Sequence, residues 1–161
     1  MRGAIRDAPW AVVSAMTVPG GQELQVARAA LAGVRRLRVD VERSWFRLDD
    51  RPAVGFERRW LVQRLIVALA RARVAAPAQP LAAHALVIAG WPGERILPRA
   101  ARNRLHVALH RLRRLGLDDA LCCAPGGWFL ASELELALRE PGGATVVAPP
   151  IAGSVREVSS W

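Results

Sequence analysis

The chain has 161 residues, 52% of them hydrophobic, and a formal net charge of +9, which suits one small domain with a buried core. No apolar run approaches the roughly 18 residues of a membrane-spanning helix, so we expect no membrane association. The charge favours a polyanionic partner such as nucleic acid. All 23 basic residues are arginine, and a GC-rich genome is one alternative source of that excess.

The first 36 residues are the hardest to assign. An apolar stretch spans residues 10–18, and a helical pattern covers residues 22–36. We interpret residues 1–36 as an N-terminal extension of strand plus helix, and its role as an added layer, a dimerisation arm or a partner-domain remnant stays open. Asp7 and Pro9 interrupt the charged and apolar order of a signal peptide, so we expect no export.

The spacing of the apolar residues changes twice after this extension. Apolar and polar residues alternate over residues 37–48, which predicts a β-hairpin, and residues 53–54 add a third short strand. Residues 56–74 carry apolar positions at helical spacing, which predicts the long core helix. A second helix is predicted over residues 81–89, and it stops at Gly90.

A third helix is predicted over residues 98–115. Pro98 is well placed in its first turn, and Gly116 is a typical C-terminal stop signal. Two short apolar strands around the turn at 125–127 then predict a second hairpin. Residues 132–161 are predicted to be a mobile C-terminal extension, because the part from residue 141 onward is rich in Pro, Gly and Ala.

Positive charge is concentrated around the third helix. Seven arginines and no acidic residue occur between Arg95 and Leu115, whereas the rest of the chain has 16 arginines against 14 acids. Like charges at helical spacing repel each other, so a stretch of one sign favours a counter-charge from outside the protein. The alternative is a solvated helix in an arginine-rich protein.

Helical geometry divides this helix into two faces. One arc is apolar and should face the core: Ala101, Leu105, Ala108, Leu109, Leu112 and Leu115. The opposite stripe is polar and basic: Arg99, Asn103, His106, His110 and Arg113. A helix of this width fits the major groove of DNA.

Three motifs carry a resemblance to a known family. They are Trp91-Pro92 after the second helix, "ARNRLHVALHRLRR" at residues 101–114, and "GWFL" at residues 127–130. With these motifs, residues 37–131 resemble the winged-helix DNA-binding domain of OmpR/PhoB-type response regulators and of SARP-type transcriptional activators. The resemblance implies an α+β winged helix in a cytoplasmic, bacterial regulator of transcription, with residues 98–115 as the recognition helix.

The chemistry of the side chains suggests two roles in DNA binding. Arg can bond guanine bidentately and Asn adenine, each pair giving about 1 to 3 kcal/mol of base discrimination. The predicted base contacts are Arg99, Arg102, Asn103, His106 and His110. The predicted phosphate contacts, which position the protein without reading sequence, are Arg95, Arg104, Arg111, Arg113 and Arg114.

Two features depart from the resembled families. Their wing often inserts a basic residue into the minor groove, but the tip "APGG" has no charge. The 36 residues before the domain are too few for a receiver, so phosphorylation control is not implied. The alternative function is a winged helix that binds proteins and not DNA.

Four tryptophans lie in apolar runs and are predicted to be core residues: Trp45, Trp60, Trp91 and Trp128.

Nothing in the sequence predicts an enzyme, because it has no catalytic triad, paired-carboxylate cleft or phosphate loop. His106 and His110 are spaced for a metal, with Cys122 or Cys123 as further ligands, but the hairpin would have to fold onto the groove-facing surface. We therefore expect no metal and no cofactor. The adjacent cysteines are interpreted as reduced thiols.

The expected partner is double-stranded DNA. Two further partner hypotheses stay open: a homodimer on repeated half-sites, and contact of residues 1–36 with the transcription machinery or another protein.

Overall fold

The computed structural model describes residues 33–77 and 79–151. The chain divides into two units, Met1–Gly33 and Val34–Trp161, and the following account concerns the second. The predicted apolar stretch at 10–18 and most of the predicted helix at 22–36 lie outside the described residues. That helix does not extend to Arg36, because Arg36 begins a strand and pairs with Glu135.

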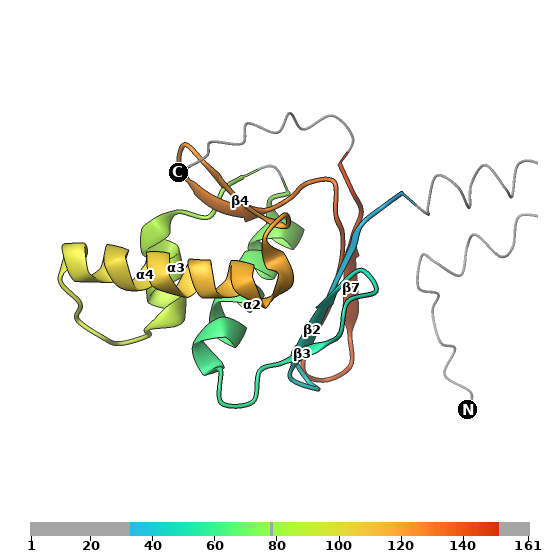
Figure 1. Ribbon diagram of the computed structural model, residues 1–161, viewed down its shortest axis with the longest axis horizontal. Helices are drawn as coiled ribbons and strands as arrows, with labels where there is room; N and C mark the ends of the chain where they lie inside the picture. Colours follow the sequence, from blue (N-terminus) through green and yellow to red (C-terminus); the bar gives the residue numbers. More distant parts are fainter. Residues whose placement is uncertain (1–32, 78, 152–161) are drawn as a thin grey trace, which may run out of the picture. The chain divides into compact units, whose positions relative to one another are not determined.

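The described part of the chain is an α+β fold, as expected (Figure 1). Its elements in chain order are β1 (Arg36–Asp40), β2 (Trp45–Leu48), β3 (Val54–Gly55), α2 (Trp60–Ala75), α3 (Ala83–Gly90), α4 (Pro98–Leu112), the π-helical turn η2 (Arg113–Leu117), β4 (Leu121–Ala124), β5 (Gly127–Leu130), β6 (Glu135–Arg139) and β7 (Thr145–Ala148). Among these residues, no helix has the length and apolar character needed to cross a bilayer.

Five strands form one sheet, in the order β3-β2-β1-β6-β7. β1 pairs antiparallel with β2 and parallel with β6, and β6 pairs antiparallel with β7. The prediction of a mobile tail from residue 132 is therefore wrong over residues 132–148. Leu134, Leu136 and Leu138 alternate along this segment and are each at most 2% exposed, so burial holds it in the sheet.

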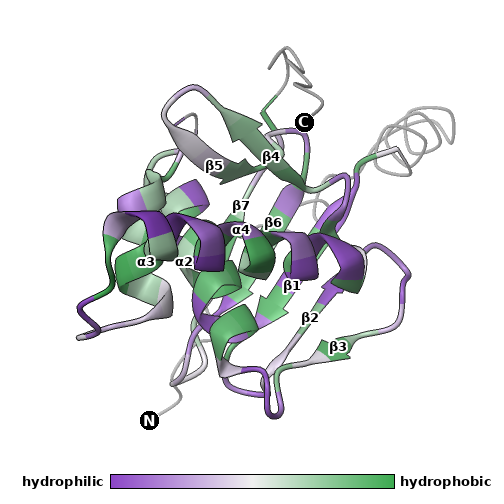
Figure 2. Ribbon diagram, turned by 60° about the vertical axis from the view of Figure 1, so that its left-hand side comes forward, coloured by the Kyte–Doolittle hydropathy of each residue, from purple (hydrophilic) through white to green (hydrophobic). Residues whose placement is uncertain are grey.

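The long helix α2 forms the centre of the core. It contacts the sheet, α3, α4 and β5, so several of its sides are covered. Val62 and Ile66 are buried together with Leu65 and Leu69, so the buried surface of α2 covers more than one row of residues. Figure 2 shows the hydrophobic residues of the helices and the sheet facing one another.

The hairpin formed by β4 and β5, hereafter the β4–β5 hairpin, is tied to the segment before α3. Leu81 donates a backbone hydrogen bond to Trp128 (2.8 Å) and accepts one from it (3.0 Å), so α3 begins two residues later than predicted. Gly127 beside this bridge has a φ of +150°, and a Cβ there would lie 2.1 Å from the carbonyl oxygen of Leu81. Only glycine fits this close approach.

A buried arginine connects α2 to the segments that follow the hairpin. Arg73 is 3% exposed, and its Nη2 donates to the backbone oxygens of Ser132 (2.8 Å) and Pro149 (3.0 Å). Burial lowers the pKa of Arg73, and the charge of Glu133 opposes this shift. Arg73 thus joins both ends of the β6–β7 segment to the core, a contact that composition does not reveal.

A surface ion pair gives this segment a testable pH dependence. Arg71 donates from Nε and Nη2 to both carboxylate oxygens of Glu140, each at 2.8 Å, and this lowers the pKa of Glu140. A lowered carboxyl pKa adds stability above the unfolded value, and this stability is lost as the pH falls through the folded value. We expect Arg71→Gln to reduce the free energy of unfolding at neutral pH by at most about 1 kcal/mol, because Arg71 is exposed.

The difference between wild type and Arg71→Gln should begin to shrink as the pH falls below the ordinary glutamate pKa of 4.5, and it should disappear once the pH is below the lowered pKa of Glu140 in the folded protein. Urea unfolding at a series of pH values measures it. Arg43→Gln is the control, since Arg43 is exposed and forms no ion pair within the described residues. A difference that stays constant down to low pH would contradict the ion-pair origin.

Candidate nucleic-acid interface

The local sequence fixes both ends of α4. Leu97 is extended, and Pro98 then occupies the first turn of the helix. The regular helix ends at Leu112, three residues before the predicted end, and the chain widens into η2. Gly116 has a φ of +110°, which agrees with its predicted role as the stop, and its carbonyl accepts a hydrogen bond from Nη1 of Arg51 at 2.9 Å.

The predicted inner face of α4 is confirmed. The buried residues of the helix are Ala101, Leu105, Ala108, Leu109 and Leu112. Leu115, the last member of the predicted arc, lies in η2, where it is half-buried and packs against the core. This anchoring fixes the rotation of α4, and with it the identity of the residues that point outward.

The outward face of α4 and the turn after it is polar and basic, without an acidic residue. Its exposed members include four predicted contact residues: Arg99, Asn103, His110 and Arg114. Val107 lies among them and is 64% exposed, although an apolar side chain is not part of the polar stripe predicted from the sequence. Figure 2 shows hydrophilic residues along the outer side of α4.

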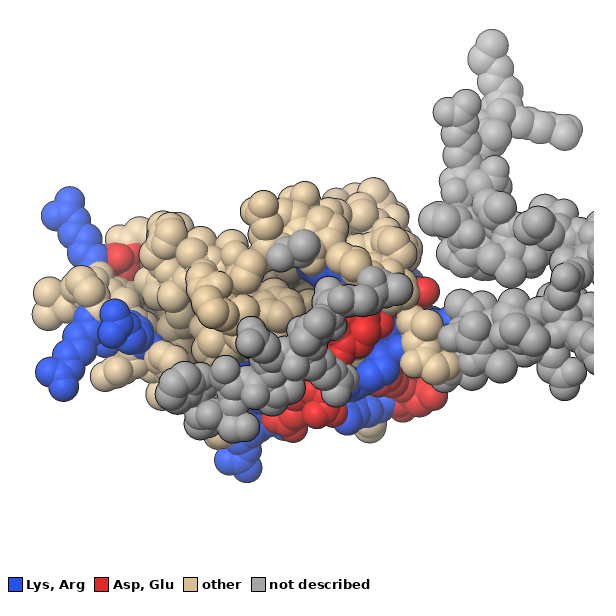
Figure 3. Space-filling view, turned by 90° about the horizontal axis from the view of Figure 1, so that it is seen from above, with Lys and Arg blue, Asp and Glu red and all other residues tan. Residues whose placement is uncertain are grey.

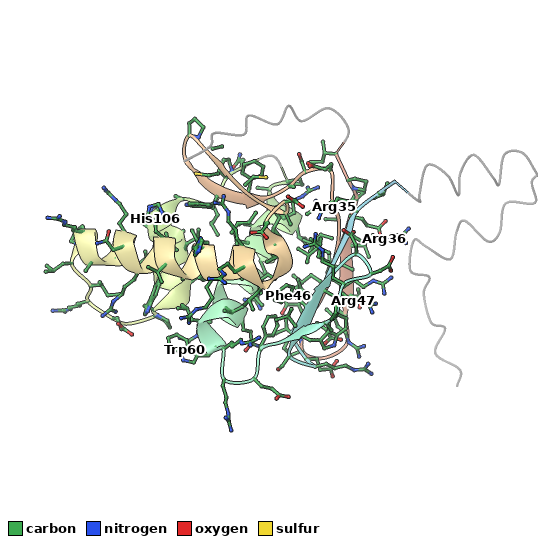
Figure 4. All side chains as sticks on the ribbon, viewed as in Figure 1. Arg35, Arg36, Phe46, Arg47, Trp60 and His106 are labelled. Atoms are coloured by element: carbon green, nitrogen blue, oxygen red, sulfur yellow. The ribbon has the colours of Figure 1, made fainter. Side chains whose placement is uncertain are left out.

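One flank of α4 faces the β4–β5 hairpin. The ring of His106, which is labelled in Figure 4, meets the ring of Trp128 edge-on, with the centroids 6.1 Å apart. The guanidinium of Arg113 lies 5.2 Å from the centroid of Trp128, and its Nη2 donates to the carbonyl of Leu121 at 3.3 Å. Arg102, one turn before His106, is exposed. Arg113 thus has partners inside the protein. Trp128 is partly buried against the hydrophobic core, and its ring also contacts His106 and Arg113.

The other flank of α4 carries the remaining predicted phosphate contacts. Arg104 forms an ion pair with Glu94 at 3.0 Å, so its charge is already neutralised. Arg111 is exposed, and Arg95 is exposed in the loop before α4. Among the described residues, neither Arg95, Arg111 nor Arg114 has an acidic partner, so these three are the phosphate candidates with unneutralised charge.

The arginines of the sheet side behave differently. Among the described residues, six ion pairs neutralise basic residues there: Arg35–Asp49, Arg35–Asp119, Arg36–Glu135, Arg51–Asp119, Arg71–Glu140 and Arg139–Glu42. Figure 3 shows basic and acidic side chains intermixed at the right of the view, over the sheet, and basic side chains projecting at the left, where α4 begins in Figure 1. Arg38, Arg43 and Arg58, which lie outside α4, are also exposed without an acidic partner among the described residues. The outward face of α4 differs because no acidic residue lies among its arginines.

The other predicted core tryptophans give a mixed result. Trp91 is buried, Trp45 is half-buried, and Trp60 is 52% exposed. Trp60 lies at the start of α2, where the guanidinium of Arg64 stacks 4.9 Å from its ring centroid (Figure 4). The prediction of a core residue is therefore wrong for Trp60, which lies on the exposed side of the first turn of α2, whereas Val62 in the same turn is buried.

The described residues do not bring three His, Cys, Asp or Glu side chains together in a way that could hold a metal ion. Cys122 and Cys123 are adjacent on β4 and face opposite sides of the hairpin, opposite Phe129 and Trp128 respectively. The alternative of a site built from the two histidines and these cysteines has no geometric support.

No model of a protein family, no curated protein and no solved structure matches this chain. The class of the protein therefore rests on its own geometry. That geometry is an α+β unit in which a basic helix buries one face, exposes the other, and lies beside a β-hairpin.

Proposed function

We propose that the protein binds double-stranded DNA in a sequence-specific way and regulates transcription, with α4 inserted in the major groove. The observation that carries this proposal is the outward face of α4, which is basic and has no acidic residue, whereas basic and acidic side chains are intermixed over the sheet. In this proposal the unit is a winged helix of the OmpR/PhoB type, with α3 and α4 as the helix-turn-helix and the β4–β5 hairpin as the wing.

The proposed division of contacts follows from position on α4. The side chains at the centre of the outward face and on its hairpin flank approach base edges: Arg99, Arg102, Asn103, His106 and His110. Arg95, Arg111 and Arg114 lie toward the ends and the opposite flank and bond phosphates. Arg104 and Arg113 contribute less, because each already has a partner within the protein.

A second candidate is a winged helix that docks on another protein. The tip of the β4–β5 hairpin is exposed and uncharged. Leu97 and Ile88 are 78% and 66% exposed, and exposed apolar side chains are typical of protein-interaction surfaces. The same binding experiment separates the two candidates.

We expect the affinity for duplex DNA to fall steeply with salt. Each neutralised phosphate contributes about −0.9 to the slope of log affinity against log salt, so the three phosphate candidates with unneutralised charge predict a slope of about −3. Fluorescence anisotropy with a labelled random-sequence duplex over a series of salt concentrations measures it.

Arg38→Gln is the matched control for the salt slope, because Arg38 is exposed and lies on β1 in the sheet and not on α4. It should leave the slope unchanged, whereas Arg111→Gln should reduce its magnitude by about 1. Undetectable or salt-independent binding at low salt would overturn the DNA proposal and favour the protein-binding candidate. Selection of bound sequences from a random duplex library then tests specificity and half-site spacing together.

A further inference from the structure

An exposed apolar side chain lies in the middle of the outward face of α4. Val107 is 64% exposed, and it is the one large hydrophobic residue of α4 that points away from the core. Asn103 lies one turn before it, and His110 and Arg111 lie one turn after it, all three exposed. The apolar surface of Val107 is therefore ringed by hydrogen-bond donors.

Folding gives no reason for a valine at this position. Val107 does not belong to the core cluster, and it is too exposed to gain much from burial in the free protein. A β-branched residue also has a lower helix propensity than alanine, because the preceding turn restricts its χ1 angle. Single exposed apolar residues are common, but this one occupies the centre of the proposed DNA-binding face.

We propose that Val107 recognises a C5-methyl group of a pyrimidine in the major groove, an inference that rests on the proposed DNA-binding function. Among the four bases, the apolar group presented in the major groove is the C5-methyl of thymine. The same methyl chemistry occurs on 5-methylcytosine. Contact between Val107 and the methyl group removes the apolar surface of both from water. This gives a preference for the methylated pyrimidine that the surrounding hydrogen-bond donors cannot supply.

The spacing on α4 also restricts which base carries the methyl group. Val107 lies four residues after Asn103, about 6 Å along the helix axis, and base pairs are stacked about 3.4 Å apart. We therefore expect the methylated pyrimidine within about one or two base steps of the base that Asn103 contacts.

The experiment removes one methyl group at a time. In the duplex selected by the full-length protein, each thymine is replaced singly by deoxyuridine, which keeps the hydrogen-bonding groups and lacks only the methyl. Wild type should lose about fourfold in affinity at one or two positions, as expected for one buried methyl group. Val107→Ala should bind the thymine duplex about as weakly as wild type binds the deoxyuridine duplex, and should show no further loss with deoxyuridine.

Two further arms complete the test. Val146→Ala removes an exposed valine of the edge strand β7, and it should respond to deoxyuridine as wild type does. Replacing each cytosine of the selected duplex by 5-methylcytosine identifies the other methyl source. A gain in affinity that wild type shows and Val107→Ala lacks would support the inference with 5-methylcytosine as the ligand.

The remaining outcomes overturn the inference in distinguishable ways. Equal responses of wild type and Val107→Ala to every methyl change would exclude methyl recognition by Val107 and leave the proposed function intact. Absence of any duplex binding would overturn the proposed function and the inference with it. Val107→Ala raises helix propensity at an exposed position, so loss of folding does not confuse these results.

Discussion

Asn103→Ala should lower the affinity for the preferred duplex by about 1 to 3 kcal/mol and abolish the preference at one base pair. The substitution leaves the charge unchanged, so the affinity for unrelated duplexes should stay nearly the same. Arg99→Ala should relax the preference at a second position and also weaken unrelated duplexes slightly, because it removes one positive charge. Competition binding against a panel of singly substituted duplexes measures both effects.

The matched comparison uses two arginines on the other flank of α4. Arg111 has no acidic partner among the described residues, whereas Arg104 is paired with Glu94 at 3.0 Å. Arg111→Ala should weaken all duplexes about equally, and Arg104→Ala should have a smaller effect, because its charge is already neutralised. If Asn103→Ala, Arg99→Ala and Arg111→Ala all reduced affinity in the same proportion on every sequence, the assignment of base and phosphate roles would be wrong.

Local signals were sufficient to predict much of the fold. Alternation placed the β1–β2 hairpin, helical spacing placed α2, and Pro98 and Gly116 marked the start of α4 and its stop. Each of these features depends on residues that are close to one another in the sequence. The buried face of α4 was also predictable, because an amphipathic helix shows its inner residues in its sequence.

The part of the fold that escaped prediction depends on contacts distant in sequence. β6 pairs in parallel with β1, whose residues lie almost one hundred positions earlier, and β6 and β7 are only five and four residues long. The Pro and Gly residues around them form the turn between the strands, and composition alone suggested disorder. The alternating leucines of β6 were the signal that could have identified this strand.

The candidate site was predictable as a list of residues, and its division into available and engaged side chains was not. Whether an arginine is unpaired depends on which acid or ring the fold brings next to it. Arg104 meets Glu94 from the preceding loop, and Arg113 meets Trp128 from the β4–β5 hairpin. Both pairs are tertiary contacts, so helical spacing placed these arginines at the candidate interface without revealing their partners within the protein.

Gly127→Ala should reduce the free energy of unfolding by about 2 to 4 kcal/mol. A Cβ at Gly127 would lie 2.1 Å from the carbonyl oxygen of Leu81, which is backbone and cannot rotate away. The substitution therefore strains a φ of +150° and also separates the two hydrogen bonds that join Leu81 to Trp128. Urea unfolding compared with wild type measures the loss.

The neighbouring glycine supplies the control for this steric effect. Gly126 has a φ of +103°, but a Cβ there would meet nothing within 4 Å. Gly126→Ala should therefore show the cost of backbone strain alone, about 1 to 2 kcal/mol. Equal losses for the two variants would contradict the role of the close approach to Leu81.

Gly127→Ala should also weaken DNA binding under conditions where the protein stays folded. Moving β5 displaces Trp128, whose ring contacts His106 and Arg113 on α4. His106 then loses the contact with Trp128 that orients its ring. The side chains on the hairpin flank of α4 would have to become ordered when DNA binds, and the lost conformational freedom lowers the affinity. We expect a loss of roughly 1 kcal/mol in affinity, about fivefold. An unchanged affinity despite the lower stability would mean that the β4–β5 hairpin does not position the recognition surface.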